Sequence, residues 1–149
     1  MAKPDSWRLE RAAYPFSNST ETRFQDLDPL GHVNNVAMAA LFENSRVRFN
    51  RSIELTNRHA SQGAGDRWLV ASVSIAYLAE AHFPDAVDVC SGIGRVGTSS
   101  WTILSAAFQG DVCVATCDTV LVLTDANGPK PLPDPIRTVF GERLVRQPA

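Results

Sequence analysis

The chain contains 149 residues, of which 44% are hydrophobic and 20% are charged, and its formal net charge at pH 7 is −2. This length suits one domain with a sizeable core and is too short for two. The slightly acidic balance, without a basic stripe, excludes the electrostatic footprint of a nucleic-acid-binding protein. No segment approaches the roughly 18 consecutive apolar residues of a membrane span, and no signal-peptide pattern appears, so we expect a cytoplasmic protein with no membrane partner.

The N-terminal part of the chain predicts an irregular segment followed by a strand. Residues 1–13 are mostly polar, and we expect a single domain over residues 14–149. Residues 14–27 favour β structure, with Phe16 and Phe24 as apolar anchors among polar neighbours. A first strand should therefore lead into the polar turn that follows.

That turn lies in residues 26–35, which read Asp-Leu-Asp-Pro-Leu-Gly-His-Val-Asn-Asn. Two carboxylates, a histidine and two amides thus fall within ten residues, between a predicted strand and a predicted helix. Asp28, Pro29 and Gly31 suit the first, second and fourth positions of a tight turn. We expect chemistry at this junction.

Asn34 is a favoured N-cap, so a helix should begin beside it and leave the backbone N–H groups of Asn35 and Val36 without intrahelical partners. Such donors, at the positive end of the helix dipole, stabilise an oxygen that becomes negative during a reaction. Asp28 and His32 would lie within a few ångströms, where the carboxylate can attack a carbonyl carbon or act as general base on water. The same residue types also make ordinary turns and caps, so a purely structural role stays open.

Residues 35–53 predict a long helix whose apolar residues recur at intervals of three and four. These residues are Met38, Leu41, Phe42, Phe49 and Ile53. The first turns are apolar nearly all round, which is typical of a buried helix. Glu43 stands three residues before Arg46, so the two side chains can pair on one face, but Glu43 is equally a candidate second catalytic group.

The second half of the chain predicts a sheet. Residues 54–67 form a loop whose length suits a lid, a ligand-lining segment or simple flexibility. From residue 68 the apolar period changes to two and predicts strands over residues 68–77, 87–96, 101–108 and 112–123. Turns follow at 109–111 and 125–128, and a proline-rich tail leads to a short terminal helix. We therefore expect an α+β fold, with a curved antiparallel sheet of about five strands wrapped around the long helix.

Three other patterns carry weaker signals. Residues 92–97 fit G-x-G-x-x-G, but strand-like alternation follows, which favours a bulge or bend over a dinucleotide site. Asp26 and Asp28 would share one face of a strand, so Asp26 could orient Asp28. The two carboxylates and His32 could also hold a divalent ion, but no further His or Cys stands at ligand spacing, and we expect no metal. Three cysteines lie in apolar runs and are expected to be buried free thiols: Cys90, Cys113 and Cys117.

The stretch from Thr22 to Asn35, followed by Glu43 and Arg46, resembles the signature of hotdog-fold acyl-CoA thioesterases, the family that includes 4-hydroxybenzoyl-CoA thioesterase. A weaker likeness extends over residues 14–137. The resemblance implies the hotdog fold and a homodimer paired through the sheet, or a tetramer of such dimers. Each active site would then lie at the subunit interface.

By this resemblance, Asp28 matches the catalytic aspartate, and the backbone N–H of Asn35 matches the donor to the thioester carbonyl. His32 and Asn34 match a polar pair that would orient water or the carboxylate. Met38 departs from the aromatic residue usual at its position, which bears on the shape of the acyl pocket.

The resemblance implies hydrolysis of acyl-CoA thioesters, with coenzyme A as part of the substrate and no separate cofactor. The acyl group would pass Gly31 and Val33 and lie along the helix at Met38 and Phe42. Candidates to meet the coenzyme A phosphates are Arg58, Arg67, Arg95 and Ser99. Two alternatives stay open: a hydratase or dehydratase acting on acyl thioesters, and a non-catalytic acyl-CoA-binding module.

Overall fold

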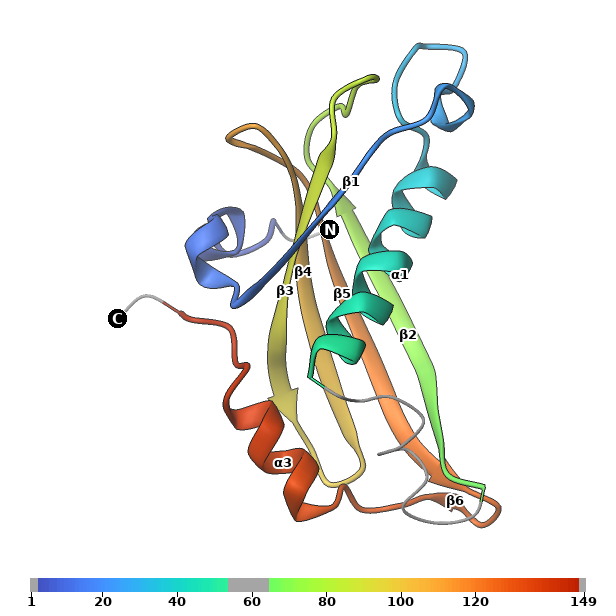
Figure 1. The fold of residues 1–149 in the computed structure, drawn as a ribbon, viewed down its shortest axis with the longest axis vertical. Coiled ribbons are helices and arrows are strands. Elements are labelled where there is room, and N and C mark those ends of the chain that lie inside the picture. Colours follow the sequence, from blue (N-terminus) through green and yellow to red (C-terminus); the bar gives the residue numbers. More distant parts are fainter. Residues whose placement is uncertain (1–2, 54–64, 148–149) are drawn as a thin grey trace.

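The computed structural model describes residues 3–53 and 65–147, which form one antiparallel sheet with a long helix across it (Figure 1). The strand order is β1-β3-β4-β5-β2, and a two-residue strand, β6, pairs with β5. The helices are α1 (Asn35–Ser52) and α3 (Asp134–Gly141). The strands are β1 (Phe16–Thr20), β2 (Arg67–Tyr77), β3 (Val87–Val96), β4 (Ser100–Gln109), β5 (Val112–Asp125) and β6 (Gly128–Pro129). The predicted α+β hotdog architecture is confirmed.

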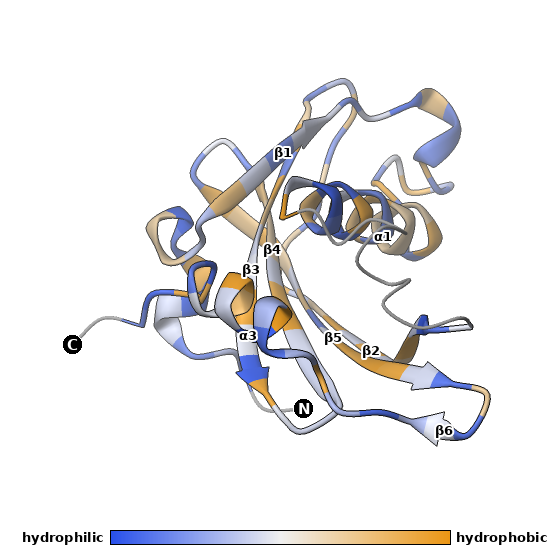
Figure 2. Ribbon diagram, turned by 60° about the horizontal axis from the view of Figure 1, so that its bottom comes forward, coloured by the Kyte–Doolittle hydropathy of each residue, from blue (hydrophilic) through white to orange (hydrophobic). Residues whose placement is uncertain are grey.

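The core lies between α1 and the sheet. Met38 and Phe42 pack with residues of β3, β4 and β5 in one buried cluster, and Phe49 packs with the far ends of the strands and with α3 in a second. Figure 2 shows hydrophobic stretches in the strands behind α1. In the described ranges, no helix is long and apolar enough to cross a membrane.

The predicted strands of the second half of the chain agree with the structure to within a few residues. β3 has the predicted bounds, and Gly110, at φ 58°, turns the chain between β4 and β5. The pairing of β3 with β4 shifts register between Ile93 and Val96, which confirms the expected irregularity in the glycine-rich segment. A Cβ atom on Gly92 would lie 2.7 Å from the ring of Pro15, so close packing explains that glycine.

The prediction for residues 14–27 is wrong in its second half. β1 ends at Thr20, and Phe24–Asp26 forms a short 3-10 helix. Phe24 is no anchor, because it is 77% exposed. The turn is held by Asp26, whose backbone N–H donates to the Arg23 carbonyl and whose carboxylate accepts from the Arg23 backbone N–H and guanidinium. β propensity does not detect this interaction.

The N-terminal segment is more ordered than predicted. Ser6–Leu9 and Arg11–Ala13 form two short 3-10 helices, and Arg8 is buried whereas Leu9 is exposed. Arg8 donates from Nη2 to Asp118 Oδ1 at 2.7 Å and from Nε to the Tyr14 hydroxyl at 3.0 Å. These long-range partners order a segment whose own composition is unremarkable.

The cysteines behave as structural thiols. Cys90 and Cys117 are buried and free, as predicted, while Cys113 is only half-buried. Burial raises the pKa of Cys113 to about 11 and also raises the pKa of the other two thiols. All three are therefore protonated at neutral pH and are poor nucleophiles.

Candidate active site

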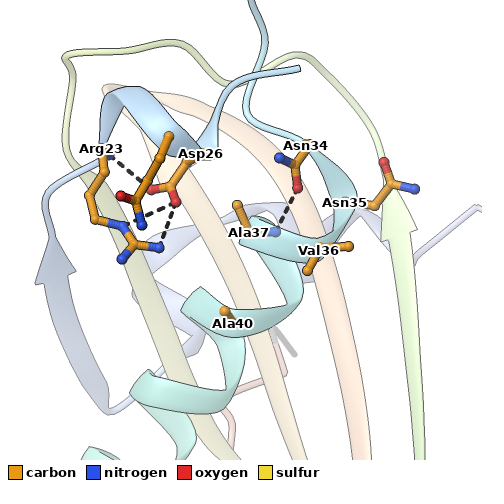
Figure 3. Close-up of a pocket in the computed structure, with 8 residues that line it drawn as sticks. Arg23, Asp26, Asn34, Asn35, Val36, Ala37 and Ala40 are labelled. Atoms are coloured by element: carbon orange, nitrogen blue, oxygen red, sulfur yellow. Dashed lines mark hydrogen bonds and ion pairs between the residues drawn. The ribbon is translucent and has the colours of Figure 1, made fainter. Parts of the chain in front are cut away.

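The N-terminus of α1 forms the centre of the candidate site. The helix begins at Asn35, and the Oδ1 atom of its N-cap, Asn34, accepts a hydrogen bond from the backbone N–H of Ala37 at 2.8 Å (Figure 3). This cap confirms the predicted helix start. The first backbone N–H groups of a helix have no acceptor within it, and the cap accepts only from that of Ala37, so those of Asn35 and Val36 have no partner in the helix. Two adjacent donors of this kind suit the binding of an oxyanion.

A cavity of about 420 Å³ opens beside these donors. In Figure 3 the Arg23 and Asp26 side chains stand on one side of this space, and Ala37 and Ala40 lie along the helix on the other. Its lining residues are Arg23, Gln25, Asp26, Asn34, Asn35, Val36, Ala37 and Ala40. The cavity is thus polar near the 3-10 helix and apolar along α1.

Asp26 is buried in this wall and committed to Arg23. Its Oδ1 accepts from Arg23 Nη2 at 2.8 Å and Nε at 3.1 Å, and its Oδ2 accepts from the Arg23 backbone N–H at 2.9 Å. The side-chain hydrogen bonds from Arg23 lower the pKa of Asp26. The expected strand face shared by Asp26 and Asp28 is absent, because Phe24–Asp26 forms a 3-10 helix. The role of Asp26 in orienting Asp28 stays a prediction.

Asp28 begins a tight loop that returns to α1. Its Oδ1 accepts from the backbone N–H groups of Leu30 at 2.9 Å and His32 at 3.2 Å, and its backbone carbonyl accepts from the N–H of Gly31 at 2.9 Å. Gly31 has φ +82°, a conformation that favours glycine. Among the residues that the structure describes, none donates a hydrogen bond to Asp28 Oδ2. One carboxylate oxygen therefore holds the loop, and the other is available.

The loop is closed at its base and joined to the helix. Leu27 pairs with Val33, and the backbone N–H of Asn34 donates to the carbonyl of Asp26 at 2.9 Å. Val33 is half-buried against the core beneath α1. Asp28 and His32 do not line the cavity in this single chain, so their predicted approach to the helix donors stays a prediction.

Residues that the sequence reasoning missed support the loop from the connection between β2 and β3. The Nε2 atom of His32 lies 3.1 Å from Oε2 of Glu80, and the His32 ring packs edge-on against that of His82 with 5.4 Å between centroids. Glu80 and His82 stand in an exposed connection with no local motif, so no sequence signal marked them. In the described ranges, no three His, Cys, Asp or Glu side chains lie close enough together to hold a metal ion.

Several predicted substrate-binding residues lie elsewhere. Met38 and Phe42 are buried in the core beneath α1 and do not line the cavity, so their role as acyl contacts stays a prediction. Arg67 is the first residue of β2 and Tyr77 is the last. The Tyr77 hydroxyl donates to the Asn35 carbonyl at 3.5 Å, so the end of β2 lies beside the start of α1. Arg67 is ten strand residues away, about 30 Å from the start of α1.

Arg95 and Ser99 stand where β3 ends and β4 begins, at the same far end of the sheet (Figure 1). None of the predicted phosphate contacts that the structure describes therefore lies beside the helix donors of its own chain. Arg58 falls outside the described residues.

Glu43 and Arg46 lie one turn apart in the middle of α1, and Arg46 reaches β5. Glu43 Oε2 is 3.9 Å from Arg46 Nη2, which confirms the predicted pair. The Arg46 side chain is nearly buried and donates to the Thr119 hydroxyl at 3.4 Å, whereas Glu43 is 72% exposed. This arrangement suits a structural pair, and a catalytic role for Glu43 stays a prediction.

The comparisons with known proteins identify the family. The sequence profile of the thioesterase-like superfamily matches residues 22–140, which span the Asp28 loop, α1 and the whole sheet after it. The chain belongs to the thioesterase-like superfamily. Membership of this superfamily supports thioester hydrolysis as the general activity.

Solved structures of thioesterases share the fold of this superfamily member. A thioesterase from Thermus thermophilus, crystallised with coenzyme A and zinc, is 29% identical, with a TM-score of 0.75, and the match covers 87% of this chain and 94% of that one. A predicted thioesterase from Bacillus stearothermophilus is 26% identical, with a TM-score of 0.76 over 90% and 98% of the two chains. The uncharacterized protein YsmA of Bacillus subtilis is 23% identical over 120 residues, 79% of each chain.

Proposed function

We propose that this superfamily member hydrolyses acyl-CoA thioesters, with Asp28 as the catalytic carboxylate. The observation that carries the proposal is the capped N-terminus of α1, whose two free N–H groups face a cavity and adjoin the loop that holds Asp28. The Thermus thioesterase crystallised with coenzyme A supports coenzyme A as the thiol portion of the substrate.

In the proposed reaction the thioester carbonyl oxygen binds to the N–H groups of Asn35 and Val36. Asp28 then either accepts a proton from water as the water oxygen attacks the carbonyl carbon, or attacks that carbon itself to give an anhydride that water hydrolyses. In both routes the carbon–sulfur bond breaks, the thiolate of coenzyme A leaves and takes up a proton, and a carboxylic acid forms. Loss of one oxyanion donor typically costs about a hundredfold in rate.

Asn34 and His32 have separable roles in this scheme. Asn34 Oδ1 accepts from Ala37 in the helix cap, so Asn34 fixes the start of the helix, and its amide NH2 can orient a water. His32 supports the Asp28 loop by donating from its backbone N–H to Asp28 Oδ1, and its ring lies against Glu80.

A second copy of the chain would complete the site. β2 pairs on one edge with β5 and its other edge is unpaired in the described chain, while Leu69, Val70, Val73 and Tyr77 are about half-exposed. An apolar unpaired edge favours pairing with another chain, and a two-fold axis would pair β2 antiparallel with the partner's β2. That pairing would cover the exposed face of α1 and form an acyl pocket between the subunits.

Thiol release from a panel of short, medium, long and aryl acyl-CoAs tests the function. Asp28→Asn keeps an oxygen acceptor for Leu30 and His32, so the loop should stay folded while the carboxylate is lost. We expect release by the wild type, a fall of about a hundredfold or more in Asp28→Asn, and no change in Asp111→Asn, a matched control in the exposed β4–β5 turn. Acyl-CoA binding without release by the wild type would instead favour the binding module, and hydration of an enoyl-CoA would favour the hydratase.

A further inference from the structure

The Asp28 loop is held by the connection between β2 and β3. Residues 80–82 of that connection contact His32 and Val33 of the loop. The carbonyl of Ala81 accepts from the backbone N–H of Val33 at 2.8 Å, Glu80 lies 3.1 Å from the His32 ring, and the ring of His82 packs edge-on against it. Glu80, Ala81 and His82 lie outside the sequence motif of residues 22–35.

The connection is itself anchored, so it presents Glu80 from a fixed support. The side chain of Gln109, at the end of β4, accepts from the backbone N–H of His82 at 2.8 Å and donates to its carbonyl at 2.8 Å. Gln109 also donates to the carbonyl of Asp85 at 3.1 Å, and Ala81 is buried in the core. These contacts fix the backbone from which the Glu80 side chain projects.

His32 connects Glu80 to Asp28. Its backbone N–H donates to Asp28 Oδ1 at 3.2 Å, and its ring meets the Glu80 carboxylate through Nε2. We propose that Glu80 is a positioning residue for the proposed thioesterase, on which this inference rests: its carboxylate accepts the Nε2–H of His32 and holds the ring in one orientation and tautomer. Nδ1 is then left as a proton acceptor, as in other carboxylate–histidine pairs.

Glu80 is largely exposed, so its contact with His32 adds little to stability and Glu80→Ala should fold normally. The tautomer can be measured without any activity, because the chain has only three histidines. Nitrogen-15 NMR of the imidazoles at a pH where they are neutral should show a larger share of the Nε2–H form for His32 than in a free imidazole, with the signal assigned from its loss in His32→Gln. We expect that share to fall in Glu80→Ala and to be kept in Glu80→Gln, whose amide oxygen still accepts.

Kinetics supply the second arm. We expect Glu80→Ala to lower kcat about tenfold or more with KM within about twofold, and Glu80→Gln to recover most of the loss. Glu142→Ala, at the end of α3, is the matched control and should change neither measurement. An unchanged tautomer, an unchanged kcat, or equal losses in Glu80→Ala and Glu80→Gln would overturn the proposal. An inactive wild type would refute the proposed function, and the NMR arm would still decide whether Glu80 holds His32.

Discussion

The two faces of α1 are built from similar apolar residues but have different surroundings. Met38, Phe42 and Phe49 face the chain's own sheet and are at most 3% exposed, whereas Val36 is 80% and Val47 is 51% exposed. The prediction of a helix buried all round is therefore wrong for the single chain. Apolar periodicity indicates that a surface is to be covered, and it does not say by which chain.

Truncation on the inward face should give the largest effect. Phe42→Ala removes a ring from the core beneath α1, and we expect the free energy of unfolding to fall by about 3–5 kcal/mol. Val36→Ala, on the outward face, should change it by no more than about 0.5 kcal/mol. Urea unfolding of both variants measures the contrast, and similar losses would contradict the assignment of the two faces.

A charge on the outward side tests the proposed second copy. Val73 pairs with Thr119, the residue that Arg46 of α1 contacts, so its half-exposed side chain lies on the helix side of the sheet. Val73→Lys should weaken self-association at least about tenfold in analytical ultracentrifugation, because two like charges would meet across the axis. Val112→Lys, an exposed valine beside the β4–β5 turn, is the control. A wild type that sediments as a monomer would refute the interface.

The N-cap of α1, at the start of both faces, should give a smaller effect. Asn34→Ala should lower the free energy of unfolding by about 1 kcal/mol, because Ala37 loses the acceptor for its N–H. Asn34→Asp keeps an acceptor oxygen and should retain most of that stability. Chemical unfolding measures the difference, and equal losses in the two variants would rule out the cap as the cause.

The smallest effect concerns the cavity wall and depends on pH. Arg23 lowers the pKa of Asp26 in the folded chain, so their interaction stabilises the fold above the unfolded pKa, near 4. It is lost as the pH falls through the lower folded pKa. The stability difference between wild type and Arg23→Gln should therefore be full at pH 6 and shrink towards pH 2. A difference that does not change with pH would indicate a packing effect.

Local patterns predicted much of the fold and part of the site. The bounds of β3, the turn at Gly110 and the N-cap at Asn34 each depend on residues close in sequence, and all three are confirmed. The junction of turn and helix was recognised for the same reason, since the orphan donors of a helix end follow from the cap alone.

The prediction missed one local contact and several distant ones. β1 ends at Thr20 because residues 24–26 form a 3-10 helix in which the Asp26 carboxylate accepts hydrogen bonds from Arg23, a local contact that outweighs β propensity. The contacts of the N-terminal segment and of the His32 ring join residues far apart in the chain, and no local pattern indicates them.

The sequence by itself determined the class of fold, the start of α1 and the loop that carries Asp28, because propensity, turn chemistry and capping act over a few residues. Only the tertiary structure decided that Glu80 faces His32, that β2 is an edge strand, and that one face of α1 is left uncovered. Those features join segments far apart in the chain, and their geometry exists only once the sheet has assembled around the helix.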